Sequence, residues 1–325
     1  MMQTVCFIAA VPEQSLPGKR AAKSKRSYTG VKFAMKTLSL LVACSVACPA
    51  VAEQKLPPFT EAVLPMESDL YAVSIGPGGP GEEFGSDATN GGLYRIASDG
   101  ETEEIELSDG QGLRNPTGMV RAGNQIIIVD GNEVISTQPD GAVSWRQGLD
   151  EDGVFLYDIE VLNENTLLVS DFGRGAFLSV APQTGQIQPY HGDLRISGLA
   201  RFAIAETGIY AVSWGSDDAW DSALYWVPHS DNGHTVATLS EGFGNLESVE
   251  IVNETVIVGG YRGHEKYPNA KLLRVETDGT VHPLITGSHS RGISDIFFDG
   301  SSIWLTYFYD ASYAELPSQV AQNLD

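Results

Sequence analysis

The sequence predicts an all-β protein folded as a six-bladed β-propeller. Turns that contain glycine recur along the chain, and their first residues lie 41, 44, 48 and 46 positions apart. This spacing matches the roughly 40 to 50 residues of one propeller blade. The five turns are Asp99-Gly100, Asp140-Gly141, Thr184-Gly185, Asn232-Gly233 and Asp278-Gly279.

Six short apolar runs accompany these turns and set the number of blades. Each run is rich in β-branched or aromatic residues and is bounded by polar turn formers, which is typical of a buried strand. We interpret each run as the second strand of one blade. The runs are residues 70–75, 126–130, 167–171, 209–214, 256–259 and 303–307.

The sixth unit differs from the others at its end. Residues 309–325 hold mainly turn formers and polar residues, so we expect this unit to stop after its second strand. Residues 54–59, at the start of the predicted mature chain, should then supply the missing outer strand. Such a join closes the ring and removes exposed sheet edges.

Two segments resemble NHL repeats and units of the gluconolactonase (regucalcin-type) superfamily. They are IIIVDGNEVISTQPDG, residues 126–141, and LLVSDFGRG, residues 167–175. The resemblance extends over most of residues 61–309 and implies a six-bladed propeller. It says less about chemistry, because one fold hosts many unrelated functions.

Residues 35–52 have the pattern of a secretory signal peptide. Lys36 gives a charged start, residues 38–46 form an apolar run, and small residues precede a cleavage point near Ala52. We therefore expect a periplasmic or secreted protein whose mature chain, residues 53–325, is a single domain.

Two features of the first 52 residues leave alternatives. Residues 1–34 are basic and show no period, so we interpret them as an extension upstream of a true start at Met35. Residues 41–44 resemble a lipobox, so a lipoprotein anchored at Cys44 is the minority alternative to a freely secreted protein.

The predicted mature chain is strongly acidic. Removing residues 1–52 leaves 13 of 20 Lys+Arg and 41 of 42 Asp+Glu, a net charge of 13 − 41 = −28. This charge repels nucleic acid, and no mature segment approaches the roughly 18 apolar residues of a transmembrane span. All three cysteines precede residue 53, which excludes disulfides and thiolate chemistry.

The predicted binding surface lies at one end of the central channel, where the first strand of each blade begins; we call this end the mouth. Loops between second and third strands also lie at this end, and three of them are long: residues 76–91, 215–222 and 260–270. Long loops on a rigid scaffold usually carry binding sites, although tolerated surface insertion is the alternative.

Residues at the starts of the first strands should gather around the mouth, and several carry carboxylates. They are Glu61, Thr117, Asp158, Arg201, Glu247 or Ser248, and Asp295. Calcium takes six to eight oxygen ligands, and converging carboxylates repel one another without a cation. In the resembled families a divalent ion at this place polarises a lactone or ester carbonyl, which implies calcium ligands at Glu61, Asp158 and Asp295. The asparagine ligands of those families have no counterpart here.

Arg201 supports a different interpretation of the same residues. A guanidinium keeps its charge and would compete with a metal or bind an anionic group of a ligand. The alternative to a calcium site is therefore an ion-pair ring of Arg201 with Asp158 and Glu247. Arg201 and Glu247 are also candidate ligand-binding residues.

Two further residues are candidates in the long loops. His264 is the best-placed general base, because imidazole titrates near neutral pH, with an exposed loop residue as the alternative. Trp220 lies among Asp217, Asp218 and Asp221 and is a candidate for stacking on a ligand at the rim.

Two functions fit these predictions. The first is an exported propeller that binds a small molecule at the mouth, acting as a metal-dependent lactone or ester hydrolase with calcium and His264. The second is a non-enzymatic module that binds a protein or glycan partner on the same face, with Trp220, Tyr261 and Tyr267 supplying aromatic contacts. Metal content and turnover separate the two.

Overall fold

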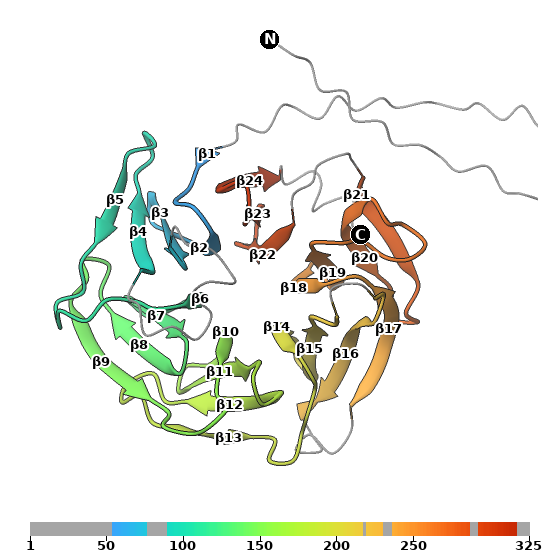
Figure 1. Cartoon of the computed structure of the whole chain (residues 1–325), viewed down its shortest axis with the longest axis horizontal. Helices are drawn as coiled ribbons and strands as arrows, with labels where there is room; N and C mark the ends of the chain where they lie inside the picture. The colour runs from blue at the N-terminus through green and yellow to red at the C-terminus, as the bar shows by residue number, and fades with distance from the viewer. Residues whose placement is uncertain (1–53, 77–89, 217–218, 230–235, 287–291, 317–325) are drawn as a thin grey trace, which may run out of the picture. The chain divides into compact units, whose positions relative to one another are not determined.

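The computed structural model describes residues 54–76, 90–216, 219–229, 236–286 and 292–316, which form six four-stranded antiparallel sheets arranged in a ring (Figure 1). The predicted six-bladed β-propeller is confirmed. These ranges contain no α-helix, and therefore none that could cross a membrane. The predicted signal peptide, Cys44 and the cleavage point near Ala52 lie outside the described residues.

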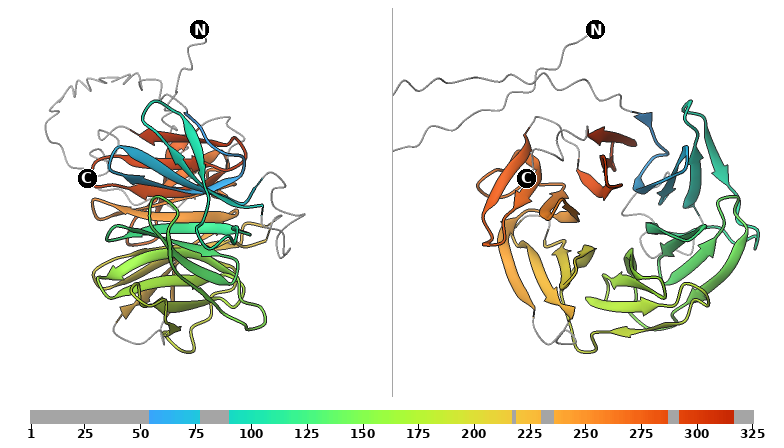
Figure 2. Two further views of the ribbon diagram at one scale, coloured as in Figure 1. Left: turned by 90° about the vertical axis from the view of Figure 1, so that its left-hand side faces the viewer. Right: turned by 180° about the vertical axis from the view of Figure 1, so that it is seen from behind.

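In the first five blades the four strands run from the channel to the periphery in chain order, whereas the sixth blade has β22, β23 and β24 followed by β1 (Figures 1 and 2). The first strands, which line the channel, are β2 (Thr60–Met66), β6 (Pro116–Ala122), β10 (Leu156–Asn163), β14 (Leu199–Ile204), β18 (Leu246–Val252) and β22 (Ile293–Phe298). The second strands are β3 (Asp69–Ser74), β7 (Gln125–Asp130), β11 (Thr166–Asp171), β15 (Gly208–Ser213), β19 (Thr255–Gly260) and β23 (Ile303–Tyr307).

The third strands are β4 (Gly92–Ile96), β8 (Glu133–Thr137), β12 (Ala176–Val180), β16 (Ser222–Pro228), β20 (Ala270–Val275) and β24 (Ser312–Leu316). The outer strands are β5 (Thr102–Ile105), β9 (Val143–Gly148), β13 (Ile187–Tyr190), β17 (Ala237–Phe243), β21 (Val281–Thr286) and β1 (Gln54–Lys55). Each predicted apolar run coincides with a second strand to within three residues at either end.

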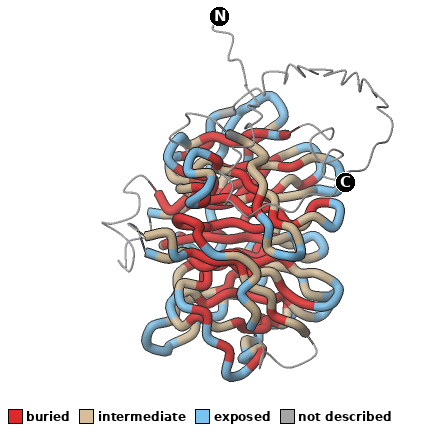
Figure 3. The backbone as a smooth tube through the Cα atoms, turned by 90° about the vertical axis from the view of Figure 1, so that its right-hand side faces the viewer, coloured by how far each residue is buried: buried red, intermediate tan, exposed pale blue. Residues whose placement is uncertain are grey.

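The second strands are apolar because both of their faces are covered by neighbouring blades. Five of the six residues of β7 and of β11 are buried, whereas the outer strand β5 is almost wholly exposed. Figure 3 shows in addition that buried residues lie mainly along the strands and exposed residues in the turns. A strand buried on both faces gains from an unbroken apolar run rather than an alternating one.

Six apolar clusters form the core, and each lies mainly between two adjacent blades. Val129 and Val169 belong to the cluster between the second and third blades, and Val63 and Trp304 to the one between the first and sixth. The hydrophobic free energy therefore holds blade to blade around the whole ring, at about 25 cal/mol for each Å² of apolar surface buried.

The ring closes between the two ends of the described chain. β1 pairs with β24, with Gln54 opposite Tyr313 and Lys55 opposite Ser312. The predicted outer strand from residues 54–59 is thus present, although only two residues long. The expectation that the sixth unit stops after its second strand is wrong, because β24 is a third strand. Its residues are buried against neighbouring blades, which sequence composition did not reveal.

The loops between second and third strands have the lengths that the sequence predicts. They are long in the first, fourth and fifth blades and short in the second and third, where β7 ends at Asp130 and β8 begins at Glu133. Parts of the long loops, residues 77–89 and 217–218, lie outside the described residues.

Candidate functional site

A repeated backbone irregularity builds the mouth of the channel. In all six blades the pairing of the first and second strands shifts register near the start of the first strand. Such a β-bulge leaves a residue without an opposite in the ladder and turns its side chain in a new direction. The residues at these shifts are Glu61, Thr117, Tyr157, Ala200, Arg201, Glu247 and Ser294.

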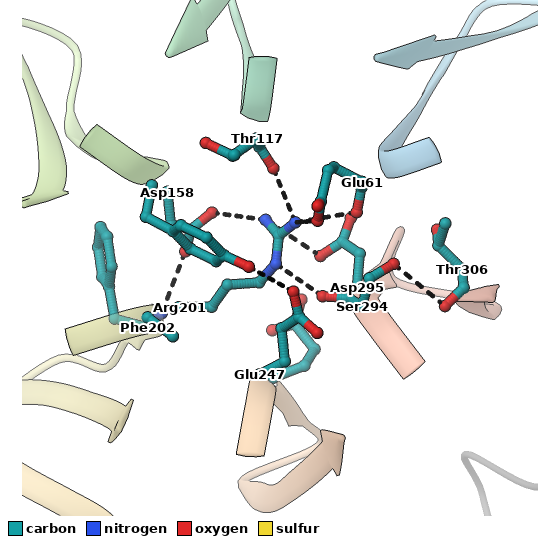
Figure 4. A network of polar contacts seen from close by, with 12 residues as sticks. Glu61, Thr117, Asp158, Arg201, Phe202, Glu247, Ser294, Asp295 and Thr306 are labelled. Atoms are coloured by element: carbon teal, nitrogen blue, oxygen red, sulfur yellow. Dashed lines mark hydrogen bonds and ion pairs between the residues drawn. The ribbon is translucent and has the colours of Figure 1, made fainter. Parts of the chain in front are cut away.

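Arg201 lies at the centre of this set and is 3% exposed (Figure 4). Its Nε donates to the carbonyl of Ser294 at 2.8 Å, and Nη1 donates to Asp158 Oδ1 at 3.0 Å. Nη2 donates to the carbonyls of Glu61 at 2.9 Å and Thr117 at 2.8 Å. One guanidinium from β14 thus links the first, second, third and sixth blades, using four of its five N–H groups.

Three carboxylates surround the same guanidinium. The closest nitrogen–oxygen distances are 3.0 Å to Asp158, 3.7 Å to Asp295 and 3.8 Å to Glu61. Asp158 also accepts the Phe202 N–H at 3.0 Å. Burial raises the pKa of Asp158 and of Asp295, and Arg201 opposes that rise in both cases. We refer to Arg201 with these three carboxylates as the arginine hub.

Glu61 and Glu247 form a second feature beside the hub, which we call the acidic pair. Their side chains are 2% and 1% exposed, and the Oε2 atom of each has no hydrogen-bond partner. The Tyr157 hydroxyl donates to Glu247 Oε1. Burial, and then repulsion from Glu247, raises the pKa of Glu61 well above its usual value. Burial raises the pKa of Glu247 to about 7, although Tyr157 and Arg201 lower it. Two buried carboxyls repel unless a proton or a cation lies between them.

Aromatic side chains surround the acidic pair at the mouth. In the third to sixth blades, the residue directly after the second strand is aromatic; these four residues are Phe172, Trp214, Tyr261 and Phe308. We call them the aromatic rim. Tyr261 lies 5.3 Å from Trp214 and 6.2 Å from Phe308 between ring centroids, and Phe172 lies 5.5 Å from Tyr157. Tyr261 also contacts the Glu247 carboxyl, so the rim and the acidic pair adjoin.

Glu160 and Glu250 form a second group of carboxyls farther along the channel. Each lies two residues beyond the point where the pairing of the first and second strands resumes after the bulge, Glu160 after Asp158 and Glu250 after Ser248. Burial, and then repulsion from Asp158, raises the pKa of Glu160 well above its usual value. Burial raises the pKa of Glu250 to about 7, although the N–H groups of Ile251 and Phe298 donate to its carboxylate at 2.7 and 3.2 Å. Carboxyls thus flank the guanidinium on both sides.

The predicted calcium ligands are brought together, but around a cation that the chain itself supplies. Glu61, Asp158 and Asp295 all contact Arg201, so a calcium ion at their meeting point would displace the guanidinium. Across the described residues, no group of three or more His, Cys, Asp or Glu side chains is arranged to hold a metal ion. The geometry is closer to the alternative, an ion-pair ring around Arg201. Asp158 is a partner as expected, but Asp295 and Glu61 are the other partners in place of Glu247. The calcium site stays a prediction.

His264 lies away from the channel contacts of Arg201. Its Nε2 bonds the Glu241 carbonyl at 3.0 Å, and its Nδ1 accepts the Lys266 N–H at 3.1 Å. The ring lies edge-on against Phe243 at 4.9 Å, and burial lowers its pKa. Both ring nitrogens are thus occupied by backbone groups, which is an arrangement that holds the fifth-blade loop in place. Its role as general base stays a prediction.

One face of the Trp220 ring contacts a cation of the protein itself. The Arg262 guanidinium carbon is 4.4 Å from its ring centroid, a cation–π contact between loops of the fourth and fifth blades. Asp221 accepts both the N–H and the hydroxyl of Ser216, so it shapes its own loop. Asp217 and Asp218 lie outside the described residues.

Three residues of the site, Glu160, Glu250 and Tyr157, were not found from the sequence, whereas Tyr261 was named there as an aromatic contact. Glu160 and Glu250 occupy matching positions in aligned first strands. Aligning the repeats, and noting that alternate side chains of a strand point to the same side as Asp158, would have found them. Tyr157 precedes Asp158, and only the bulge turns both side chains to the channel. Tyr261 belongs to the aromatic rim, whose recurrence after the second strands is visible in the sequence once the blades are aligned.

Comparison with known proteins gives a match in fold. No family model and no curated protein sequence matches the chain. A catalytically inactive virginiamycin B lyase from Staphylococcus aureus, in a structure with quinupristin, has a TM-score of 0.54 and 14% identity and covers 79% of this chain and 80% of its own. A streptogramin B lyase has a TM-score of 0.52 and 11% identity, with coverage of 79% and 78%.

An extracellular domain of a putative one-component system from B. thetaiotaomicron is also similar. Its TM-score is 0.51 at 13% identity, and the match covers 78% of this chain but 32% of that one. Identities at this level show the fold alone. These matches confirm the propeller fold that the resemblance implied.

Proposed function

We propose that the protein binds a small ligand at the mouth of its central channel. The observation that carries the proposal is the acidic pair next to the aromatic rim, in which Glu61 and Glu247 each keep one buried oxygen, Oε2, without a hydrogen-bond partner. Burying a carboxyl without a partner destabilises a fold, and groups held in this way cluster at functional sites. A lyase of the same fold described with quinupristin supports ligand binding by such a propeller.

Binding is favoured over hydrolysis because the reactive groups are occupied. Arg201 directs four N–H groups at protein acceptors, and both nitrogens of His264 bond the backbone. A general base needs a free lone pair within reach of a substrate proton. Among the described charged candidates named from the sequence, Glu61 and Glu247 are the ones that keep a buried polar atom without a hydrogen-bond partner.

The second candidate is the metal-dependent lactone or ester hydrolase that the family resemblance implies. The convergence of Glu61, Asp158 and Asp295 at one point favours it. It requires Arg201 to leave that point when calcium binds. Lactone or ester turnover that chelator abolishes and calcium restores would support the hydrolase.

Export is part of the proposal. The leader-like residues 35–52 and the acidic composition support a periplasmic or secreted protein, and one similar structure is an extracellular domain. Cell fractionation of the full chain, with mass measurement of its N-terminus, tests cleavage near Ala52 against lipidation at Cys44.

A binding screen tests the proposed function. Purified protein should gain thermal stability with at least one class of small molecule in a panel of neutral, cationic and anionic compounds. Isothermal titration should give one site, and Glu61→Gln with Glu247→Gln should weaken binding at least tenfold, or about 1.4 kcal/mol. The matched control is Glu104→Gln on the exposed strand β5. Capture of a protein or glycan partner, with no small molecule bound, would favour the binding module instead.

A further inference from the structure

We infer that the ligand carries a primary ammonium group, which Glu61 and Glu247 bind while the aromatic rim contacts the organic part. This inference rests on the proposed function and names its ligand class. Three properties of the mouth support it: the charge, the missing donors and the aromatic faces.

The charge of the mouth favours a cation. Four carboxyls, those of Glu61, Asp158, Glu247 and Asp295, share the single guanidinium of Arg201. The predicted mature chain adds a net charge of −28, which repels anions over a longer range. The cations beside the rim are engaged, since Arg262 lies over Trp220 and Lys271 donates to the Tyr261 carbonyl.

The missing hydrogen-bond donors select an ammonium with N–H groups. Glu61 Oε2 and Glu247 Oε2 are buried without a hydrogen-bond partner, although Glu61 Oε2 lies 3.8 Å from Arg201 Nη2, while Tyr157 already supplies Glu247 Oε1. A primary ammonium offers three donors, enough for both oxygens, and such charge-assisted bonds are about twice as strong as neutral ones. A quaternary ammonium offers none and would leave both oxygens unsatisfied, which weakens its binding.

The aromatic rings favour the same ligand. Tyr157 already holds a cation against its ring, with the Arg201 guanidinium carbon 5.8 Å from the centroid. Tyr261 contacts Glu247 and lies among Trp214, Phe308 and the 59%-exposed Tyr309. Aromatic faces attract cations and also pack against apolar groups. A small amine with an alkyl or aryl body fits this surface.

The test uses matched triplets of probes built on ethyl, butyl, phenylethyl and indolylethyl groups. Each triplet contains a primary amine, the alcohol of the same shape and the trimethylammonium compound. Isothermal titration of the full chain should give the tightest binding for an amine, at least tenfold tighter than its alcohol and its trimethylammonium counterpart. Glu247→Gln and Glu61→Gln should each weaken the amine at least tenfold and the alcohol less than threefold.

Several outcomes overturn the inference, and they differ from those that overturn the proposed function. Alcohols or anions that bind as tightly as the amines would reject the ammonium group but keep a ligand site at the mouth. Equal affinity of amine and trimethylammonium compound would reject the role of the N–H donors. Amine binding that Glu104→Gln weakens as much as Glu247→Gln would reject the acidic pair. No binding by any probe or screened compound would reject the proposed function as well.

Discussion

The arginine hub and the acidic pair are neighbours in the channel, yet they differ in how their charges are satisfied. In the hub, Arg201 and Asp158 have hydrogen bonds that join several blades. In the acidic pair, Glu247 and Glu61 each keep a buried oxygen without a donor. The hub therefore contributes to the fold, whereas the pair is retained at a cost to stability. This difference separates Arg201 and Asp158, which hold the ring together, from the Glu61 and Glu247 carboxyls, which we propose bind the ligand.

The largest expected effect comes from removing the centre of the hub. Arg201→Met should destabilise the protein by about 3 to 5 kcal/mol, because it leaves buried carboxylates without their cation. Chemical denaturation measures the change. Arg95→Met is the matched control, since its side chain is 45% exposed beside Glu103 and should lose less than about 1 kcal/mol. Equal losses for both variants would show that the hub is not the stabilising element.

The next effect compares the same isosteric change in the two regions. Asp158→Asn should lose about 2 to 3 kcal/mol, because Arg201 then lacks its nearest buried counter-charge. Glu247→Gln should change stability by less than about 1 kcal/mol at pH 7 or raise it, since it removes repulsion from Glu61. Equilibrium unfolding of the two variants measures both. A larger loss for Glu247→Gln than for Asp158→Asn would reverse the assignment of roles.

The pH dependence of stability tests the carboxyls on the far side of the hub. The pKa of Glu250 is about 7 in the folded protein, above the ordinary 4.5, so the folded state holds this proton more tightly. Its contribution is fully present below about pH 4.5 and is lost as the pH rises through 7. Relative to Glu250→Gln, wild-type stability should thus fall by about 2 to 3 kcal/mol between pH 4.5 and 7.5. A constant difference, or one that grows with pH, would contradict the raised pKa.

The smallest expected effect concerns calcium. If Arg201 fills the meeting point of the carboxylates, Asp158→Ala and Asp295→Ala should lower the melting temperature equally with and without calcium. A bound calcium ion would stabilise the folded state and make the loss depend on calcium. Differential scanning fluorimetry with calcium and with chelator distinguishes the two. A loss seen only with calcium would restore the predicted metal site.

Much of the fold could be predicted because its determinants are local. The apolar run that becomes β7 and the turn at Asp140-Gly141 are each read within a few residues, and their repetition indicates blades. The third strand β24 was missed because its burial comes from neighbouring blades: Tyr313 packs against the first blade, far away in the sequence, and Leu316 belongs to the cluster shared with the fifth blade. The residue composition near β24 therefore could not predict these contacts.

The candidate site was predicted only in part, for a similar reason. The sequence placed Glu61, Asp158, Arg201 and Asp295 together, since they begin aligned strands. It could not decide between a metal and Arg201 as the central cation, because both require the same carboxylates. It also missed Tyr157, whose direction depends on the bulge between Leu156 and Asp158.

The sequence by itself determined the repeating unit, the number of blades and the ring of polar residues around the channel, since each follows from periodic patterns of residue type. The tertiary structure decided which of those polar residues satisfy one another. Arg201 bonds a carbonyl 140 residues away at Glu61 and another 93 residues away at Ser294. Such contacts depend on ring closure and on bulges that turn single side chains, and these are properties of the assembled blades.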